Sequence, residues 1–316
     1  MNLVDSTGEK HAAGTRRPRL KRSERRTEAL FGYLFLTPWL VGMAVVTLGP
    51  IIASLYLAFT DYSAGGDARW VGLDNFVYMF TKDPRYWKSV GVTLTYVLVS
   101  VPLVLLFALI LAMILERGIR FLPLYRAIYY VPSLLGGSVA IAVLWRRIFG
   151  GDGLVNDLLA LVGIHGPNYL GSPAWAVWTL IVLHVWTFGA PMIIFLAGLR
   201  QISGELYDSA AVDGATGWKK FWYITLPQLS PLILFNGILV MIGSFQAFTG
   251  AYIISGGTGG PVDSTLFYTL YLYQRGFSYY DFGYASSMAW VLLVTIGSAT
   301  ALMFALSRRW VYYGEE

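Results

Sequence analysis

The sequence predicts an all-α membrane protein that crosses the bilayer six times. Its composition is the first indication, because 56% of its 316 residues are hydrophobic and only 13% are charged, whereas soluble domains carry about 25% charged residues. The second is that the apolar residues form long runs almost free of charge, and a span needs about 20 of them to cross roughly 30 Å of hydrocarbon. The third is an uneven distribution of lysine and arginine between the loops.

Six runs are long enough to cross a membrane. They cover residues 29–59, 89–115, 127–145, 173–199, 229–254 and 282–307. The first run follows a basic tail, as a cleaved signal peptide would, but it far exceeds the apolar core of about 7–15 residues that such peptides have. Pro38 and Pro50 interrupt it. We therefore expect a retained, kinked helix whose freed carbonyls are satisfied by neighbouring helices.

Positive charge sets the expected orientation of these helices. With the N-terminus inside, 16 Lys and Arg residues would face the cytoplasm and 7 would face the other side, as the positive-inside rule requires. Arg146 and Arg147 go against this balance without overturning it. Both termini and the loop 200–228 are then expected in the cytoplasm.

The chain is expected to have two parts, a basic disordered tail at 1–28 and a transmembrane domain at 29–316. The tail would set the topology, bind anionic membrane lipid at about 1 kcal/mol per basic residue, or do both, and the topological role is the simpler interpretation. Because much of the net charge of +5 lies in this tail, the charge does not indicate nucleic acid.

The sequence offers little catalytic chemistry. It has no cysteine and only three histidines, so Cys-ligated metals are excluded and no His-Glu-x-x-His pattern occurs. Gly214 and Gly217 precede Lys219, but the spacing of a phosphate-binding loop is not met. His184 is the one titratable side chain deep in a span, and such residues are candidates for function. The simpler interpretation is a neutral imidazole hydrogen-bonded to an adjacent helix.

The loop 200–228 has the most distinctive anatomy. Ser203 can cap a short helix, Glu205 would suit the positive end of its dipole, and Gly214 can take the left-handed conformation that ends a helix. A second short helix would follow before the proline that begins the fifth span. Its aromatic stripe consists of Trp218, Phe221 and Trp222. This surface suits a cytoplasmic partner, although an ordinary loop with interfacial aromatics has the same pattern.

The loop also resembles the signature of ABC-importer permeases, in which Glu-Ala-Ala precedes Gly and then Ile-x-Leu-Pro at fixed spacing. The matching positions are Asp208, Ser209, Ala210, Gly214, Ile224, Leu226 and Pro227. Asp213 and Ala215 match the commoner Asp-Gly-Ala extension around the glycine. Asp208 stands where Glu is usual and Ser209 where Ala is usual. Asp keeps the charge on a side chain that is one methylene shorter.

The likeness extends over most of the chain. Short segments at 59–61, 72–76, 196–199, 255–261 and 281–286 are similar to carbohydrate-importer permeases of the maltose and glycerol-3-phosphate type. The chain most resembles the first of the two permeases that such systems pair.

The resemblance implies a type I ABC-importer permease fold in a bacterial inner membrane. It implies a heterodimer with a second permease, two copies of a cytoplasmic ATPase that bind ATP and Mg, and an extracytoplasmic solute-binding protein that delivers a sugar. This chain would hold no cofactor, catalyse no reaction and bind no nucleic acid. The segment 203–215 would seat on one ATPase as a coupling helix. The implied coupling residues are Glu205, Asp208, Ser209, Ala210, Asp213, Gly214, Ala215, Ile224, Leu226 and Pro227.

Sugar sites combine aromatic faces with hydrogen-bonding groups, which are costly to bury in lipid. The resemblance places the contact region on the fourth and fifth helices. The candidate residues are Trp186, Thr187, Ser244, Gln246, Phe248 and Tyr252. Ser244 and Gln246 are the more informative, since aromatic residues also serve packing or face lipid. In some such systems only one of the two permeases touches the sugar.

Two other classes of function compete. A stand-alone secondary transporter would need inverted-repeat symmetry or carboxylates at mid-depth, and no predicted span carries Asp, Glu, Lys or Arg in its interior. An integral membrane enzyme would need clustered Asp, His or Glu at the end of a span. The nearest such cluster consists of Glu205, Asp208 and Asp213. These residues already belong to the loop 200–228, whose spacing resembles the permease signature. The sequence therefore favours the permease of an ATP-driven sugar importer.

Overall fold

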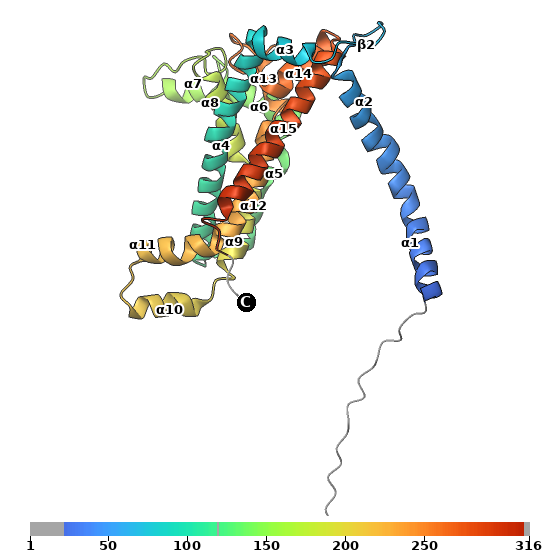
Figure 1. The fold of residues 1–316 in the computed structure, drawn as a ribbon. Helices are drawn as coiled ribbons and strands as arrows, with labels where there is room; N and C mark the ends of the chain where they lie inside the picture. Colours follow the sequence, from blue (N-terminus) through green and yellow to red (C-terminus); the bar gives the residue numbers. More distant parts are fainter. Residues whose placement is uncertain (1–21, 119, 313–316) are drawn as a thin grey trace, which may run out of the picture. The chain divides into compact units, whose positions relative to one another are not determined.

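The computed structural model describes residues 22–118 and 120–312, mostly as helices (Figure 1). Contacts divide the chain into two units, the first ending at Ser54 and the second beginning at Leu55. Of the predicted tail at 1–28, residues 1–21 lie outside the described residues. The two units are described separately below.

The described part of the first unit, residues 22–54, is one long helix. Helix α1 (Arg22–Gly42) continues through a π-helical turn (Met43–Leu48) into α2 (Gly49–Leu57), whose last residues belong to the second unit. The helix therefore begins before the predicted start at residue 29. Pro50 has no amide to donate, and the wider π-helical turn precedes it. The helix is thus wound more widely before Pro50, and neither Pro38 nor Pro50 breaks it.

The second unit is built around α4 (Pro84–Glu116). This helix has 33 residues and packs against α8 (Ala176–Trp186), α9 (Gly189–Leu199) and α12 (Leu226–Phe245). Helix α15 (Phe282–Ser307) packs on α12 and has the predicted boundaries of the sixth span. Figure 1 shows α4 and α15 running along the length of this unit.

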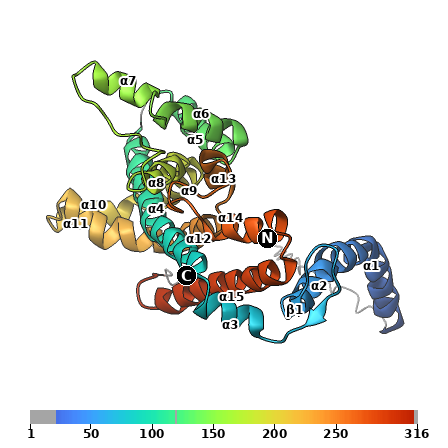
Figure 2. The same ribbon diagram turned by 90° about the horizontal axis from the view of Figure 1, so that it is seen from above.

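The third predicted span, 127–145, is not one continuous helix but a pair of helices with a sharp bend between them. Helix α5 (Leu122–Leu135) ends at Gly136, and α6 (Val139–Phe149) and α7 (Leu154–Ala160) continue at an angle of 96°. The reason is local, because two glycines follow α5 and Ser138 then caps a new helix by accepting from the amide of Ile141. Figure 2 shows α6 and α7 extending sideways from the rest of this unit.

The fourth predicted span is also bent. Helices α8 and α9 meet at Thr187 and Phe188 with an angle of 42°. Among the described residues, four helices are long and apolar enough to cross a membrane, and the number rises to six if each bent pair is one span. The predicted number of six spans is therefore reached only if each bent pair of helices counts as one span.

The predicted second short helix of the loop 200–228 is wrong as a separate element. Helix α11 (Gly217–Lys220), a π-helical turn (Phe221–Thr225) and α12 form one continuous helix. Pro227 was expected to mark the start of a new helix, but the π-helical turn before it accommodates the missing amide. The aromatic stripe is therefore the first part of the fifth span itself.

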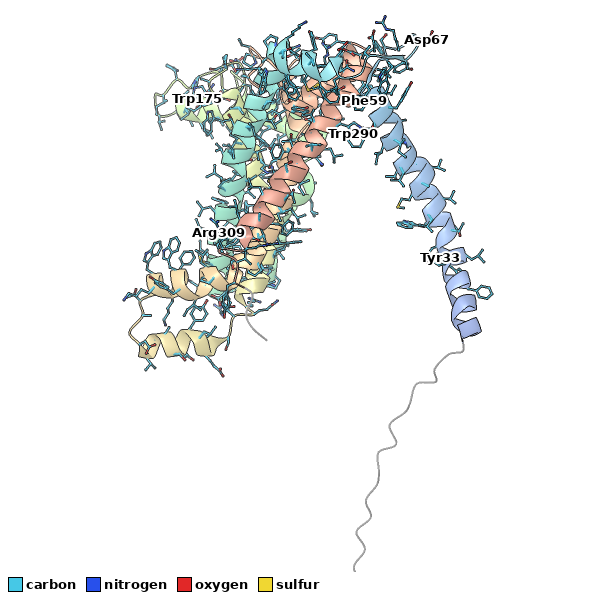
Figure 3. The ribbon with its side chains drawn as sticks, viewed as in Figure 1. Tyr33, Phe59, Asp67, Trp175, Trp290 and Arg309 are labelled. Carbon is cyan, nitrogen blue, oxygen red and sulfur yellow. The ribbon has the colours of Figure 1, made fainter. Side chains whose placement is uncertain are left out.

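The second unit has two distinct ends. One carries α10 (Gly204–Val212), α11 and the labelled Arg309 (Figures 1 and 3). The other carries the antiparallel strands β1 (Thr60–Asp61) and β2 (Arg69–Trp70), and helices α3 (Asp74–Thr81), α13 (Thr249–Ser255) and α14 (Tyr268–Tyr273). At the α10 end, Arg117, Arg200 and Lys220 line one hollow of about 560 Å³. Basic residues predicted to share one side of the membrane thus lie together.

Candidate functional site

Helix α10 ends in a hydrogen-bonded cap that requires glycine. The Gly214 amide donates to the Ala211 carbonyl over 3.0 Å, and the Ala215 amide donates to the Ala210 carbonyl over 2.8 Å. Together these bonds form a Schellman motif. Gly214 has a φ of 74°, a left-handed conformation that glycine adopts without the steric cost of a Cβ atom. The spacing between Ala210 and Gly214 therefore has a structural reason.

The outer surface of α10 is open. Ser203 Oγ accepts from the Glu205 amide over 3.3 Å, which confirms the predicted cap. No residue of α10 is buried, and Val212 is 89% exposed. The exposed polar side chains are those of Glu205, Asp208, Ser209 and Asp213. An acidic surface with one fully open apolar side chain suits contact with another protein.

Tyr207 attaches α10 to the start of the fifth span. Its hydroxyl lies 2.9 Å from Thr225 Oγ1 in the π-helical turn, and its ring is half-buried. Sequence reasoning missed Tyr207. The available signal was a tyrosine, a large side chain with a polar end, on a helix in which most other residues are small or acidic.

The second half of the motif packs inward. Ile224, Leu226 and Pro227 are half-buried, and Leu226 packs with Phe221 on the core that α4 and α9 form. Leu226 therefore anchors the loop to the helices. The aromatic residues that precede Ile224 in the chain are more exposed. Trp218 is 71% exposed, and its ring centroid lies 5.8 Å from that of Phe221.

The contact between α10 and the long helix has a measurable consequence. Replacing Tyr207 by Phe removes one hydrogen bond, a loss of about 1 kcal/mol, so hydrogen exchange of the α10 amides should rise roughly fivefold. Tyr223→Phe is the matched control, because Tyr223 is 80% exposed and should leave exchange unchanged. Equal exchange in wild type and Tyr207→Phe would show that this bond does not hold α10.

Three helix breaks meet at one cavity of about 300 Å³. Gly136 and Gly137 reach it from the break between α5 and α6, Thr187 from the break between α8 and α9, and residues 246–248 from the break between α12 and α13. Backbone that leaves the helix at membrane depth is tolerated only where it is buried in protein or lines a water-filled cavity. Discontinuous helices also form the binding sites of many transporters.

The cavity collects half of the predicted substrate residues. Thr187, Gln246 and Phe248 line it. Tyr252 is not among the lining residues, and its ring packs on that of Phe248 with the centroids 5.3 Å apart. Trp186 is not among the lining residues and instead lies 6.0 Å from the ring of Trp145.

Ser244 is fully buried beside the cavity and contacts His184. Its Oγ lies 3.1 Å from His184 Nε2, so the predicted hydrogen bond from His184 to an adjacent helix is confirmed. In the part of the chain that the structure describes, no group of three or more His, Cys, Asp or Glu side chains could hold a metal ion.

Sequence reasoning missed the residue that ties two of the breaks together. Ser133 Oγ on α5 donates to the Thr187 carbonyl over 2.8 Å and accepts from the Ala190 amide over 2.9 Å. It thereby satisfies backbone groups that the bend between α8 and α9 frees. A Cβ atom on Gly136 would collide with the Thr187 side chain, so the helices approach closely at this point. A lone serine in an apolar run was the only sequence signal.

A second missed cluster surrounds Asp83 at the end opposite α10. Its carboxylate accepts from the hydroxyls of Tyr271 and Tyr284, both over 2.6 Å, and from the amides of Arg85 and Tyr86 over 3.0 and 3.1 Å. Burial opposes its ionisation, but these hydrogen bonds outweigh burial and hold the pKa of Asp83 below its ordinary value. The cluster joins α4, α14 and α15.

Comparisons with known proteins agree on one family. Residues 81–312 match the family described as "Binding-protein-dependent transport system inner membrane component". The chain is 50% identical over 289 residues to the probable ABC transporter permease protein YesP of Bacillus subtilis, covering 91% of this chain and 94% of that protein. It is 33% identical to the lactose transport system permease protein LacF of Rhizobium radiobacter, covering 91% and 97%.

A solved structure supports the fold. The chain superposes with a TM-score of 0.77 on a chain of the bacterial alginate ABC transporter in complex with an alginate pentasaccharide-bound periplasmic protein. The match covers 92% of this chain and 98% of that one, at 23% identity. The fold of the chain is therefore shared with a subunit of a solved ABC transporter.

Proposed function

The chain belongs to the family of binding-protein-dependent transport system inner membrane components, and from this premise we propose what it carries and how it is driven. It is an ABC-transporter permease with a type I importer fold, and it is not an enzyme. The proposed cargo is a sugar or sugar derivative, either a di- or oligosaccharide or a compound like glycerol 3-phosphate. The chain pairs with a second permease, and the two form the pathway.

The cavity at the three helix breaks is the observation that carries this proposal. A pathway for a polyhydroxyl solute must offer hydrogen bonds inside the membrane, where unpaired polar groups are costly. Thr187 and Gln246 supply such groups, and Phe248 supplies an aromatic face. One relative belongs to a lactose transport system, which supports a saccharide as the cargo.

Helix α10 is the proposed contact with the ATPase. Its cap at Gly214 fixes its end, and its outer face is open. Tyr207 joins it to the helix that ends at Phe245, one residue before Gln246 at the cavity. A stiff element connected to the pathway is what coupling between two sites requires. Two ATPase copies would bind ATP and Mg, and both termini of this chain would lie in the cytoplasm with α10.

Uptake into proteoliposomes tests this function. The complete transporter, with ATP inside and the solute-binding protein outside, is given lactose, maltose, trehalose, arabinotriose, an alginate trisaccharide and glycerol 3-phosphate in turn. We expect uptake of at least one solute, dependent on both ATP and the binding protein. Uptake that follows an ion gradient without ATP would instead support a secondary transporter, and no uptake of any solute would refute the proposed cargo class.

Gln246 provides a sharper test of the pathway. Replacing it by Leu removes a donor and an acceptor from the cavity wall, worth about 0.5–1.5 kcal/mol per hydrogen bond. The apparent KM for the transported solute should rise about three- to tenfold. Thr295→Val is the control, since Thr295 is exposed on α15 and does not line this cavity. An unchanged KM in Gln246→Leu would remove α12 from the substrate site.

A further inference from the structure

His184 lies on α8 at the wall of the cavity. Its Nε2 is 3.1 Å from Ser244 Oγ on α12, and its ring centroid is 5.5 Å from that of Tyr96 on α4. The imidazole has two nitrogens that act differently, one as a donor and one as an acceptor when the ring is neutral. Which nitrogen carries the proton therefore decides what the side chain offers to the cavity.

The hydroxyl of Ser244 fixes that proton. A serine hydroxyl has a single proton, and Ser244 donates it to the Val240 carbonyl over 2.7 Å. Ser244 Oγ can then only accept from His184 Nε2. The protonated nitrogen is therefore Nε2, and Nδ1 of the neutral ring is a bare acceptor.

Nδ1 belongs to a residue that lines the cavity. No described residue makes a hydrogen bond to it, and it is not among the fully enclosed polar atoms that lack a partner in the described part of the chain. Because His184 lines the cavity, a solute held there is the partner available to Nδ1. The contact with Ser244 Oγ holds the ring in its orientation.

We propose that Nδ1 of His184 is a specificity-determining acceptor that receives a hydroxyl proton from the saccharide in the cavity. This inference rests on the proposed sugar pathway and adds a defined role to a residue outside the predicted substrate set. Saccharide hydroxyls are abundant donors, and a site built to hydrogen-bond a solute hydroxyl discriminates strongly against a solute that cannot pair with it. His184 would act beside Gln246 and Thr187, which line the same cavity.

The protonation state can be observed directly, because the chain has only three histidines. His11→Gln and His165→Gln leave His184 alone, and nitrogen-15 labelling of histidine in the complete transporter in lipid bilayers then reports both ring nitrogens. We expect a protonated Nε2 and an unprotonated Nδ1 in the solute-free transporter. A protonated Nδ1 would overturn the inference whatever the transporter carries.

Two substitutions separate the two nitrogens. The amide nitrogen of His184→Gln falls near the position of Nε2, so this variant keeps the donor to Ser244 and loses the acceptor. The amide oxygen of His184→Asn falls near Nδ1, so this variant keeps the acceptor and loses the contact with Ser244. With the solutes named above, His184→Gln should raise the apparent KM about three- to tenfold, and His184→Asn should raise it less.

The outcomes distinguish this inference from the proposed function. Normal wild-type uptake with an unchanged KM in His184→Gln would refute the role of Nδ1 and leave the sugar pathway intact. A larger KM increase in His184→Asn than in His184→Gln would show a structural role through Ser244 and would also refute it. No uptake of any of the solutes by wild type would refute the proposed function and the inference together.

Discussion

Replacing Gly214 by Val should abolish or nearly abolish ATP-driven transport while the protein still folds and inserts. Gly214 has a φ of 74°, which costs a β-branched residue on the order of 1–3 kcal/mol. Nothing lies within 4 Å of the position that a Cβ atom would take, so the effect would come from the backbone alone. Loss of the left-handed residue would undo the Schellman bonds at Ala210 and Ala211 and displace the end of α10.

This prediction is checked by co-purifying the ATPase with the permease and by measuring uptake. Gly214→Asn is the conservative partner, because Asn tolerates the left-handed region better than other residues, and it should retain much of the activity. Gly217→Val is the matched control, since its φ is not left-handed and the space around it is open. Normal uptake and ATPase retention in Gly214→Val would exclude α10 as the coupling element.

Replacing Asp83 by Ala should destabilise the second unit by about 3 kcal/mol, because it leaves several buried donors unpaired. Asp83 is only 5% exposed, and two of its donors, the hydroxyls of Tyr271 and Tyr284, lie 188 and 201 residues further along the chain. Thermal unfolding of the purified protein in detergent measures this loss. Tyr78→Phe is a suitable control, since Tyr78 is exposed on α3 beside the same cluster.

The carboxylate of Asp83 also leads to a prediction about how the stability of the protein depends on pH. Because the pKa of Asp83 is lowered in the folded state, its stabilisation is complete above the unfolded value of about 3.9 and is lost as the pH falls through the folded-state pKa. The stability difference between wild type and Asp83→Asn should therefore be largest near neutral pH and shrink below about pH 4. A difference that stays constant through this range would show that the charge of Asp83 contributes nothing.

Local sequence signals were sufficient to predict the helices whose ends are determined by nearby residues. The apolar run at 282–307 became α15 without change, and Ser203 and Gly214 cap α10 at the expected ends. Length, charge and capping chemistry act over a few residues, so they can be recognised without the fold. The spacing around Gly214 has the same local origin, since the Schellman bonds join residues only three and five positions apart.

The errors came from features that tertiary packing decides. The run at 127–145 has the composition of a straight span, yet it breaks at Gly136, where α5 meets the bend between α8 and α9. Pro227 suggests the start of a helix, yet a π-helical turn carries the helix through it. Ser133 and Asp83 act on partners tens to hundreds of residues away, and no pattern in one sequence reveals such pairs.

Cross-linking from α10 tests the central claim most directly, namely that this helix docks on the ATPase. The chain has no cysteine, so Val212→Cys, at a position that is 89% exposed, places a single reactive group on α10. Leu158→Cys on α7, at a position that is 56% exposed, is the control. In the assembled transporter we expect Val212→Cys to cross-link to the ATPase and Leu158→Cys not to do so. A transporter that is active but cross-links to its ATPase only from α7, or equally from both positions, would contradict the account.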